Sequence, residues 1–144
     1  MGIFRKANNI YLLLLCLFAL GSLSACSGTQ GPPDRVDVVY FHINEACACM
    51  DPMGDCIQST VFLNFQDELA SGKLTFQRLK LDDPNNADIA AKYSATPVSL
   101  FINVVRGDAE QIIPVPEMWT IRYESDALEE LVKSKIRQSL EGNQ

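Results

Sequence analysis

The sequence predicts a single α/β domain in which a four-stranded mixed sheet carries helices on both faces. Two observations lead to this prediction. Between residue 36 and the C-terminus, apolar segments typical of strands alternate with segments of helical periodicity, in the order β-α-β-α-β-β-α. The last two strands are separated only by a short turn, as in a hairpin. The predicted domain spans residues 36–144, and a stretch of that length is enough for one modest core.

The first strand and the first helix come from the segment between residues 36 and 73. Residues 36–43 read VDVVYFHI, a nearly continuous apolar run expected of a strand covered on both faces. A cysteine-containing loop follows, and the helix is expected to begin at Cys56 and to end at the SGK of residues 71–73. Its apolar positions recur at helical spacing: Ile57, Val61, Phe62, Phe65 and Leu69.

The second strand and the second helix follow directly. Residues 74–82 read LTFQRLKLD, which alternates as a strand does. Residues 83–93 predict a short helix that is opened by Pro84, with Asn85 and Asn86 as capping candidates.

A hairpin and a final helix complete the domain. Residues 98–105 and 109–115 predict strands three and four, and Pro114 and Pro116 assign the fourth to an edge of the sheet. The C-terminal helix is predicted after Ser125 and ends before Gly142. Its apolar stripe consists of Leu128, Leu131, Val132, Ile136 and Leu140.

The connections predict how the strands pair. Each of the two strand-helix-strand units is expected to join parallel strands by a right-handed crossover. The terminal hairpin then adds one antiparallel strand to the same sheet.

The N-terminus carries the features of a bacterial lipoprotein signal. Arg5 and Lys6 precede the apolar run IYLLLLCLFAL, and small residues follow it. The run is too short to span a bilayer well. Residues 23–26 read LSAC, a pattern that resembles the site where such chains are cleaved before a cysteine that is then acylated, for example with palmitate. Residues 1–25 are therefore predicted to be a signal peptide, with Cys26 lipidated.

The lipoprotein interpretation fixes the compartment and the charge of the mature chain. Residues 26–35, rich in Ser, Gly and Pro, predict a flexible tether that holds an extracytoplasmic domain at a bacterial cell membrane. Without Arg5 and Lys6, 10 basic residues face 18 acidic ones, so the net charge becomes −8 instead of −6. An acidic surface disfavours nucleic acid as a partner.

Three cysteines lie together between the first strand and the first helix. Residues 46–56 read ACACMDPMGDC, and Cys47, Cys49 and Cys56 are the three thiols left to a mature lipoprotein. A thiol at a helix N-terminus feels the positive end of the helix dipole, which lowers its pKa. Cys56 is therefore predicted to be the low-pKa thiolate. Which two cysteines pair stays open: Cys49 with Cys56 closes a comfortable loop, whereas a bridge within Cys47-Ala48-Cys49 would be small and strained.

The cysteine loop and Pro97 together resemble the thioredoxin-like superfamily. A cysteine cluster follows the first strand and leads into a helix, and SATPV places Pro97 just before the third strand. Thioredoxin-like proteins resemble one another in carrying a cis-proline there, beside the cysteines. From VVYFH to the ending after PEMWTIRYESDALEEL, the chain resembles small thioredoxin-like proteins associated with bacterial arsenic-resistance operons. Their usual C-x-x-C pair is absent, because Met53 stands three residues before Cys56.

The thiol chemistry of this loop predicts thiol-disulfide exchange or electron transfer with a protein thiol or disulfide as substrate. Cys49 and Cys56 would be the exchanging pair and Cys47 the remaining thiol. The resemblance adds Pro97 as a contact for the substrate backbone. No residue pattern in the sequence predicts a cofactor for this activity.

The same loop also predicts a soft-metal site as the alternative. Three thiolates from Cys47, Cys49 and Cys56 suit Cu(I), Zn or As(III). Met50, Met53 and His42 are weaker candidate ligands, because methionine more often fills a core and a lone histidine is more often a structural residue. A third alternative is a structural or interaction domain in which one disulfide offsets a limited core.

Overall fold

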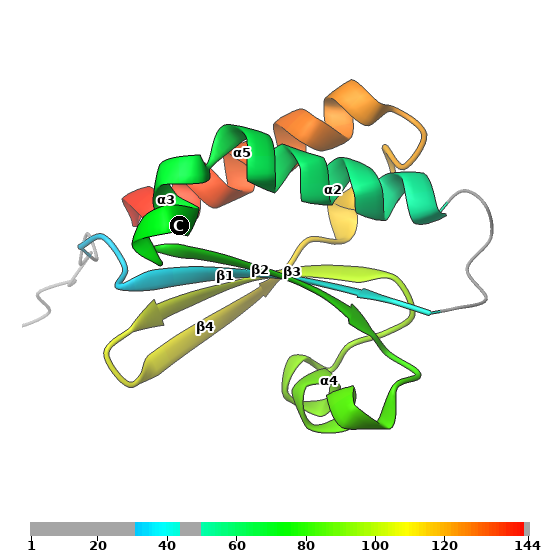
Figure 1. Cartoon of the computed structure of the whole chain (residues 1–144), viewed down its shortest axis with the longest axis horizontal. Helices are drawn as coiled ribbons and strands as arrows, with labels where there is room; N and C mark the ends of the chain where they lie inside the picture. The colour runs from blue at the N-terminus through cyan, green and yellow to red at the C-terminus, as the bar shows by residue number, and fades with distance from the viewer. Residues whose placement is uncertain (1–30, 44–49, 143–144) are drawn as a thin grey trace, which may run out of the picture.

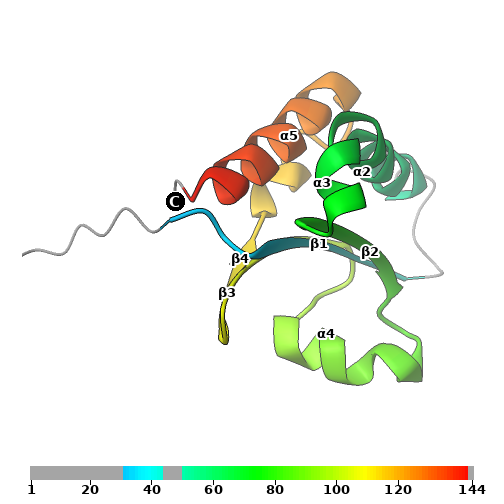
Figure 2. The same ribbon diagram turned by 60° about the vertical axis from the view of Figure 1, so that its left-hand side comes forward.

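The computed structural model describes residues 31–43 and 50–142, which fold around one four-stranded sheet in the order β2-β1-β3-β4. Helices α2, α3 and α5 cover one face of the sheet, and α4 covers the other (Figures 1 and 2). The elements are β1 (Arg35–His42), α2 (Met50–Asn64), α3 (Gln66–Ser71), β2 (Leu74–Lys80), η1 (Pro84–Asn86), α4 (Ala87–Tyr93), β3 (Ser99–Arg106), β4 (Ala109–Pro114), η2 (Pro116–Trp119) and α5 (Ser125–Glu141). The predicted α/β class and element order are confirmed.

Successive side chains of β1 point to opposite faces of the sheet and belong to two separate cores. Val36, Val38 and Tyr40 are fully buried in the larger core, which they share with α2 and α5. Val39 and Phe41 point to the opposite face and belong to a smaller core beneath α4. A strand buried on both faces explains the near-continuous apolar run of this segment.

The third strand runs in the direction opposite to the one predicted. β1 and β2 are parallel, as expected, but β3 pairs antiparallel with β1 and β4 antiparallel with β3. The reason lies in α4, whose seven residues span about 10 Å, whereas an eight-residue strand such as β3 spans about 26 Å. The helix alone does not reach back to the start of β2, and the segments that flank it do not extend toward that end. β3 therefore begins at the end of the sheet where β2 stops.

Helix α2 begins six residues earlier than predicted, at Met50 instead of Cys56. Pro52 is tolerated because it lies in the first turn, where backbone N–H groups have no partner within the helix. Gly54 allows α2 to approach the sheet closely. A Cβ atom at this position would lie 2.8 Å from the Tyr40 ring and 2.9 Å from the Arg78 guanidinium.

The remaining boundaries lie within two residues of the prediction, except in two helical segments. The single helix predicted over residues 83–93 is divided into the 3-10 helix η1 and the α-helix α4. The helix expected to run to residue 70 is broken at Phe65, which leaves helical geometry at φ −132° and ψ 40° while its ring stays buried in the larger core. Gly72 and Gly142 end α3 and α5 with φ 75°, the left-handed conformation that glycine adopts readily. β4 lies at an edge of the sheet, as predicted, and ends at Pro114, one residue earlier than expected.

The described chain enters the fold beside the β3–β4 turn. The Arg106 guanidinium Nε donates to the Gly31 carbonyl oxygen at 3.3 Å, and the Gly107 amide donates to the Asp34 carboxylate at 2.6 Å. Within residues 31–43 and 50–142, no helix combines the length and the apolar character that crossing a membrane requires. The predicted signal peptide, Cys26 and the rest of the tether up to residue 30 lie outside the described residues.

Candidate functional site

One end of the sheet gathers the segments to which the sequence assigns chemistry. His42 at the end of β1 is in register with Lys80 at the end of β2, and Phe41 is in register with Ser99 at the start of β3. Pro97 therefore lies at the same end as the chain leaving β1 toward the cysteines. The antiparallel direction of β3 is essential, because a parallel β3 would begin at the far end of the sheet, about 26 Å away.

Pro97 itself departs from the expected conformation. The described residues contain no cis peptide bond, so the bond before Pro97 is trans and the expectation of a cis-proline is wrong. The chain turns into β3 through Val98, which adopts φ 60° although it is β-branched and fully buried. Such a conformation costs on the order of 1–3 kcal/mol and persists only where packing imposes it. Pro97 remains exposed beside this strained residue.

Cys56 lies in the second turn of α2 and not at its N-terminus. The six residues from Met50 correspond to about 9 Å along the helix axis. Its side chain is half-buried against α5, where Sγ donates a long hydrogen bond to the Ser125 carbonyl oxygen at 3.5 Å. The thiol is therefore beyond the first turn, to which the favourable effect of the helix dipole is confined.

The surroundings of Cys56 raise the pKa of its thiol, contrary to the prediction. Burial is the largest cause, and the carboxylates of Glu129 and Asp126 on α5 act in the same direction. The Thr60 hydroxyl acts in the opposite direction and is outweighed. Cys56 is thus held as a neutral thiol, a poor nucleophile at neutral pH.

A small cavity of about 170 Å³ adjoins Cys56 between α2 and the segment that leads into α5. Met53 and Leu128 form its buried walls, and Arg122 and Tyr123 form its exposed rim. The Arg122 guanidinium stacks 4.4 Å from the centre of the Tyr123 ring. The sequence prediction missed Arg122, Tyr123 and Ser125, because only the packing of α5 on α2 brings them to Cys56.

The other predicted site residues have different positions. Met53 is only 2% exposed and packs in the larger core, which favours the core-filling interpretation over metal binding. The His42 ring is half-buried and stacks on the Tyr40 ring at 6.3 Å between centroids. Met50 begins α2, while Cys47 and Cys49 lie outside the described residues. Within those described, no group of three or more acidic, histidine or cysteine side chains could hold a metal ion.

Comparisons with known proteins found similarities among solved structures alone. No family model and no curated protein matches the sequence. Among solved structures, the chain is similar to a thioredoxin from Thermus thermophilus, with 11% identity over 73% of this chain and 76% of that one, at a TM-score of 0.48. It is also similar to a structure described as a malarial protein, with 16% identity over 69% of this chain and 96% of that one, at a TM-score of 0.40.

The class of the protein follows from its own elements. Strands and helices succeed one another as β-α-β-α-β-β-α, the sheet is mixed, and helices cover both of its faces. The chain has a thioredoxin-like α/β fold.

Proposed function

We propose that this protein carries out thiol-disulfide exchange on other proteins through Cys47 and Cys49, outside the cytoplasm and tethered to a bacterial cell membrane by a lipid on Cys26. One observation carries the proposal: α2 begins at Met50, the residue directly after Cys49. The unpaired N–H groups and the positive end of the helix dipole therefore lie next to Cys49 in the chain. These are the features that lower a thiol pKa and favour thiolate.

The position of Cys56 favours a pair that does not include it. Disulfide-bonded cysteines have Cα atoms about 4.4–6.8 Å apart, whereas Cys56 lies about 9 Å along the axis from the first residue of α2. A Cys49–Cys56 bridge would therefore require the start of α2 to unwind or the chain to fold back along it. Cys47 and Cys49 are the simpler pair.

The small ring that a Cys47–Cys49 bridge closes suggests the direction of exchange. A strained disulfide is a stronger oxidant than a relaxed one. A substrate thiolate attacks the bridge, forms a mixed disulfide and releases one protein thiolate. A second substrate thiol then displaces the protein sulfur, so the substrate gains a disulfide and Cys47 and Cys49 are left reduced. An extracytoplasmic oxidant must then restore the bridge.

Single cysteine variants test this assignment. We expect Cys49→Ser to abolish oxidation of a reduced dithiol peptide, and Cys56→Ser to retain most of it, because the Cys56 thiol is neutral and half-buried. Thiol trapping across graded glutathione buffers, followed by mass spectrometry, would identify the pair. We expect a Cys47–Cys49 bridge with a midpoint above about −250 mV, in the range of exchanging disulfides.

Other outcomes of the same titration would contradict the proposal. A mapped Cys49–Cys56 bridge together with an inactive Cys56→Ser variant would show that Cys56, and not Cys47, exchanges with Cys49. Three thiols that are protected only after Cu(I), Zn or arsenite is added would instead favour metal binding. A bridge that no buffer reduces would indicate a structural disulfide.

A further inference from the structure

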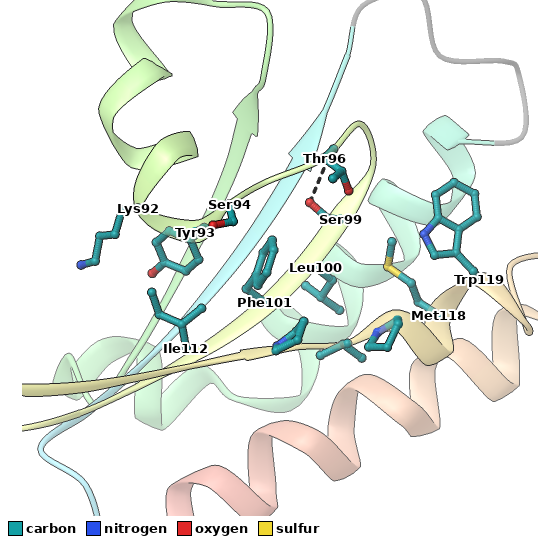
Figure 3. Close-up of a pocket in the computed structure, with 13 residues that line it drawn as sticks. Lys92, Tyr93, Ser94, Thr96, Ser99, Leu100, Phe101, Ile112, Met118 and Trp119 are labelled. Carbon is teal, nitrogen blue, oxygen red and sulfur yellow. Dashed lines mark hydrogen bonds between the residues drawn. The ribbon is translucent and has the colours of Figure 1, made fainter.

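A second and larger concavity lies along the β3–β4 edge of the sheet, and it shares no lining residue with the Cys56 cavity. It encloses about 510 Å³, within the range typical of small-molecule sites. The groove extends from the C-terminal end of α4, at Lys92 and Tyr93, past Phe101 on β3 to Trp119 on η2 (Figure 3).

The walls of this groove are apolar and held by packing. Phe101 meets Tyr93 edge-on at 5.4 Å between ring centroids, and both rings belong to the smaller core. Met118 is fully buried at the other end, beside Trp119, which is 36% exposed. A groove with such walls exists before any ligand arrives, so binding would require little reorganisation.

The polar groups of the groove are few and one of them is charged. The hydroxyls of Ser94, Thr96 and Ser99 line it, and Ser99 donates to the Thr96 carbonyl oxygen at 3.0 Å. Among the described residues that line the groove, Lys92 is the single charged side chain, and its ammonium pairs with the Glu110 carboxylate, which lies outside that lining.

Lys92 can exchange its present partner for a ligand. Its ammonium pairs with the Glu110 carboxylate, and the two side chains are 46% and 36% exposed. Exposed ion pairs of this kind contribute little free energy. A ligand anion at this end of the groove would therefore have to displace only the exposed Glu110 carboxylate from Lys92.

We propose that the groove binds an elongated monoanionic amphiphile such as a medium-chain fatty acid. Its carboxylate would bind Lys92, and its hydrocarbon chain would lie over Phe101 and reach Trp119. The inference is independent of the redox proposal, because it rests on the groove and not on the cysteines.

Trp119 is the only tryptophan of the chain, so its fluorescence reports on the far end of the groove. We expect decanoate to shift Trp119 emission to shorter wavelength in a saturable way, because the hydrocarbon chain displaces water from the ring. Lys92→Gln should weaken decanoate binding about fivefold, the upper end for one exposed ion pair. The same variant should leave the affinity for neutral decanol unchanged, and Lys73→Gln, at an exposed lysine outside the groove, should change neither.

A blocking variant tests the location independently of the charge. Ile112 is half-buried on edge strand β4 and lines the groove, so Ile112→Glu should remove decanoate binding. Gln111→Glu adds the same charge at the neighbouring exposed position and should leave decanoate binding unchanged. The proposal is wrong if decanoate produces no saturable shift, if Lys92→Gln weakens decanoate and decanol equally, or if folded Ile112→Glu binds as the parent does. If Ile112→Glu does not fold, the comparison of decanoate with decanol decides the question.

Discussion

At the scale of single residues, Cys56 illustrates how environment overrides position in the sequence. A cysteine followed by a helical pattern predicts a thiol at a helix start. The actual helix begins at Met50, and α5 then brings Glu129 and Asp126 toward the thiol. Neither effect is readable from the residues around Cys56, because α5 lies some 70 residues further along the chain.

The charge environment of Cys56 can be tested by alkylation. Because the Glu129 carboxylate helps to raise the pKa of the Cys56 thiol, Glu129→Gln should increase the rate at which iodoacetamide modifies Cys56 at pH 8. Glu130→Gln is the matched control, since Glu130 also pairs with Lys133 but is not among the groups that shift the Cys56 pKa. Mass spectrometry of the modified peptide measures both rates. Equal rates in the two variants would contradict the assigned cause.

At the scale of secondary structure, the close contact of α2 with the sheet depends on Gly54. Alanine favours a helix over glycine by about 1 kcal/mol, so Gly54→Ala would be stabilising on propensity alone. The added Cβ would lie within 3.0 Å of both the buried Tyr40 ring and Arg78, and overpacking of this kind costs about 1–3 kcal/mol. We therefore expect a net decrease in the free energy of unfolding, measured by urea denaturation.

Ser59→Ala is the control for helix propensity, because Ser59 is exposed on the same helix. It should be neutral or slightly stabilising. If Gly54→Ala were as stable as Ser59→Ala, α2 would not need its close approach to β1.

The sequence predicted the helices and strands well, and the strand directions and the contacts between elements less well. The strands and the edge position of β4 followed from apolar runs and from Pro114, which are local signals. The direction of β3 did not follow from local signals, because it depends on the length of α4 compared with that of a strand. The start of α2 was missed because Pro52 and Gly54 are typical of a turn, and only the contact with Tyr40 explains the glycine. The cavity beside Cys56 and the groove beside Trp119 required tertiary packing.

At the scale of the whole molecule, a partly buried polar cluster joins β1, β2 and β3. The Asp37 carboxylate accepts hydrogen bonds from Arg35 and Thr75 at 2.6 Å each, and from the buried Asn103 amide at 3.3 Å. Burial acts to raise the pKa of Asp37, but these hydrogen bonds outweigh it and the pKa is lowered. The cluster therefore stabilises the fold in the ionised state of Asp37.

This lowered pKa predicts a stability profile in acid. Because the folded-state pKa lies below the unfolded-state pKa, the stabilisation is present above about pH 4, the ordinary aspartate value, and is lost as the pH falls through the folded-state pKa. Asp37→Asn should lower the free energy of unfolding at pH 7 by about 1–3 kcal/mol, and the difference from the parent should shrink in acid. Asp108→Asn, at the exposed β3–β4 turn, should match the parent at every pH. Urea denaturation from pH 7 to pH 2 measures all three proteins.

The entry of the chain beside the β3–β4 turn has a consequence for orientation. Gly31 and Asp34 are hydrogen-bonded to Arg106 and Gly107, at the end of the sheet opposite to His42 and Ser99. A domain held by its N-terminus would be suspended from that turn. The long dimension of β1, about 26 Å for eight residues, would then separate the point of attachment from the end where the chain leaves for Cys47 and Cys49. If the chain is anchored by a lipid on Cys26 and reacts through Cys47 and Cys49, as we propose, the reacting end lies at the end of the sheet that is farther from the point of attachment.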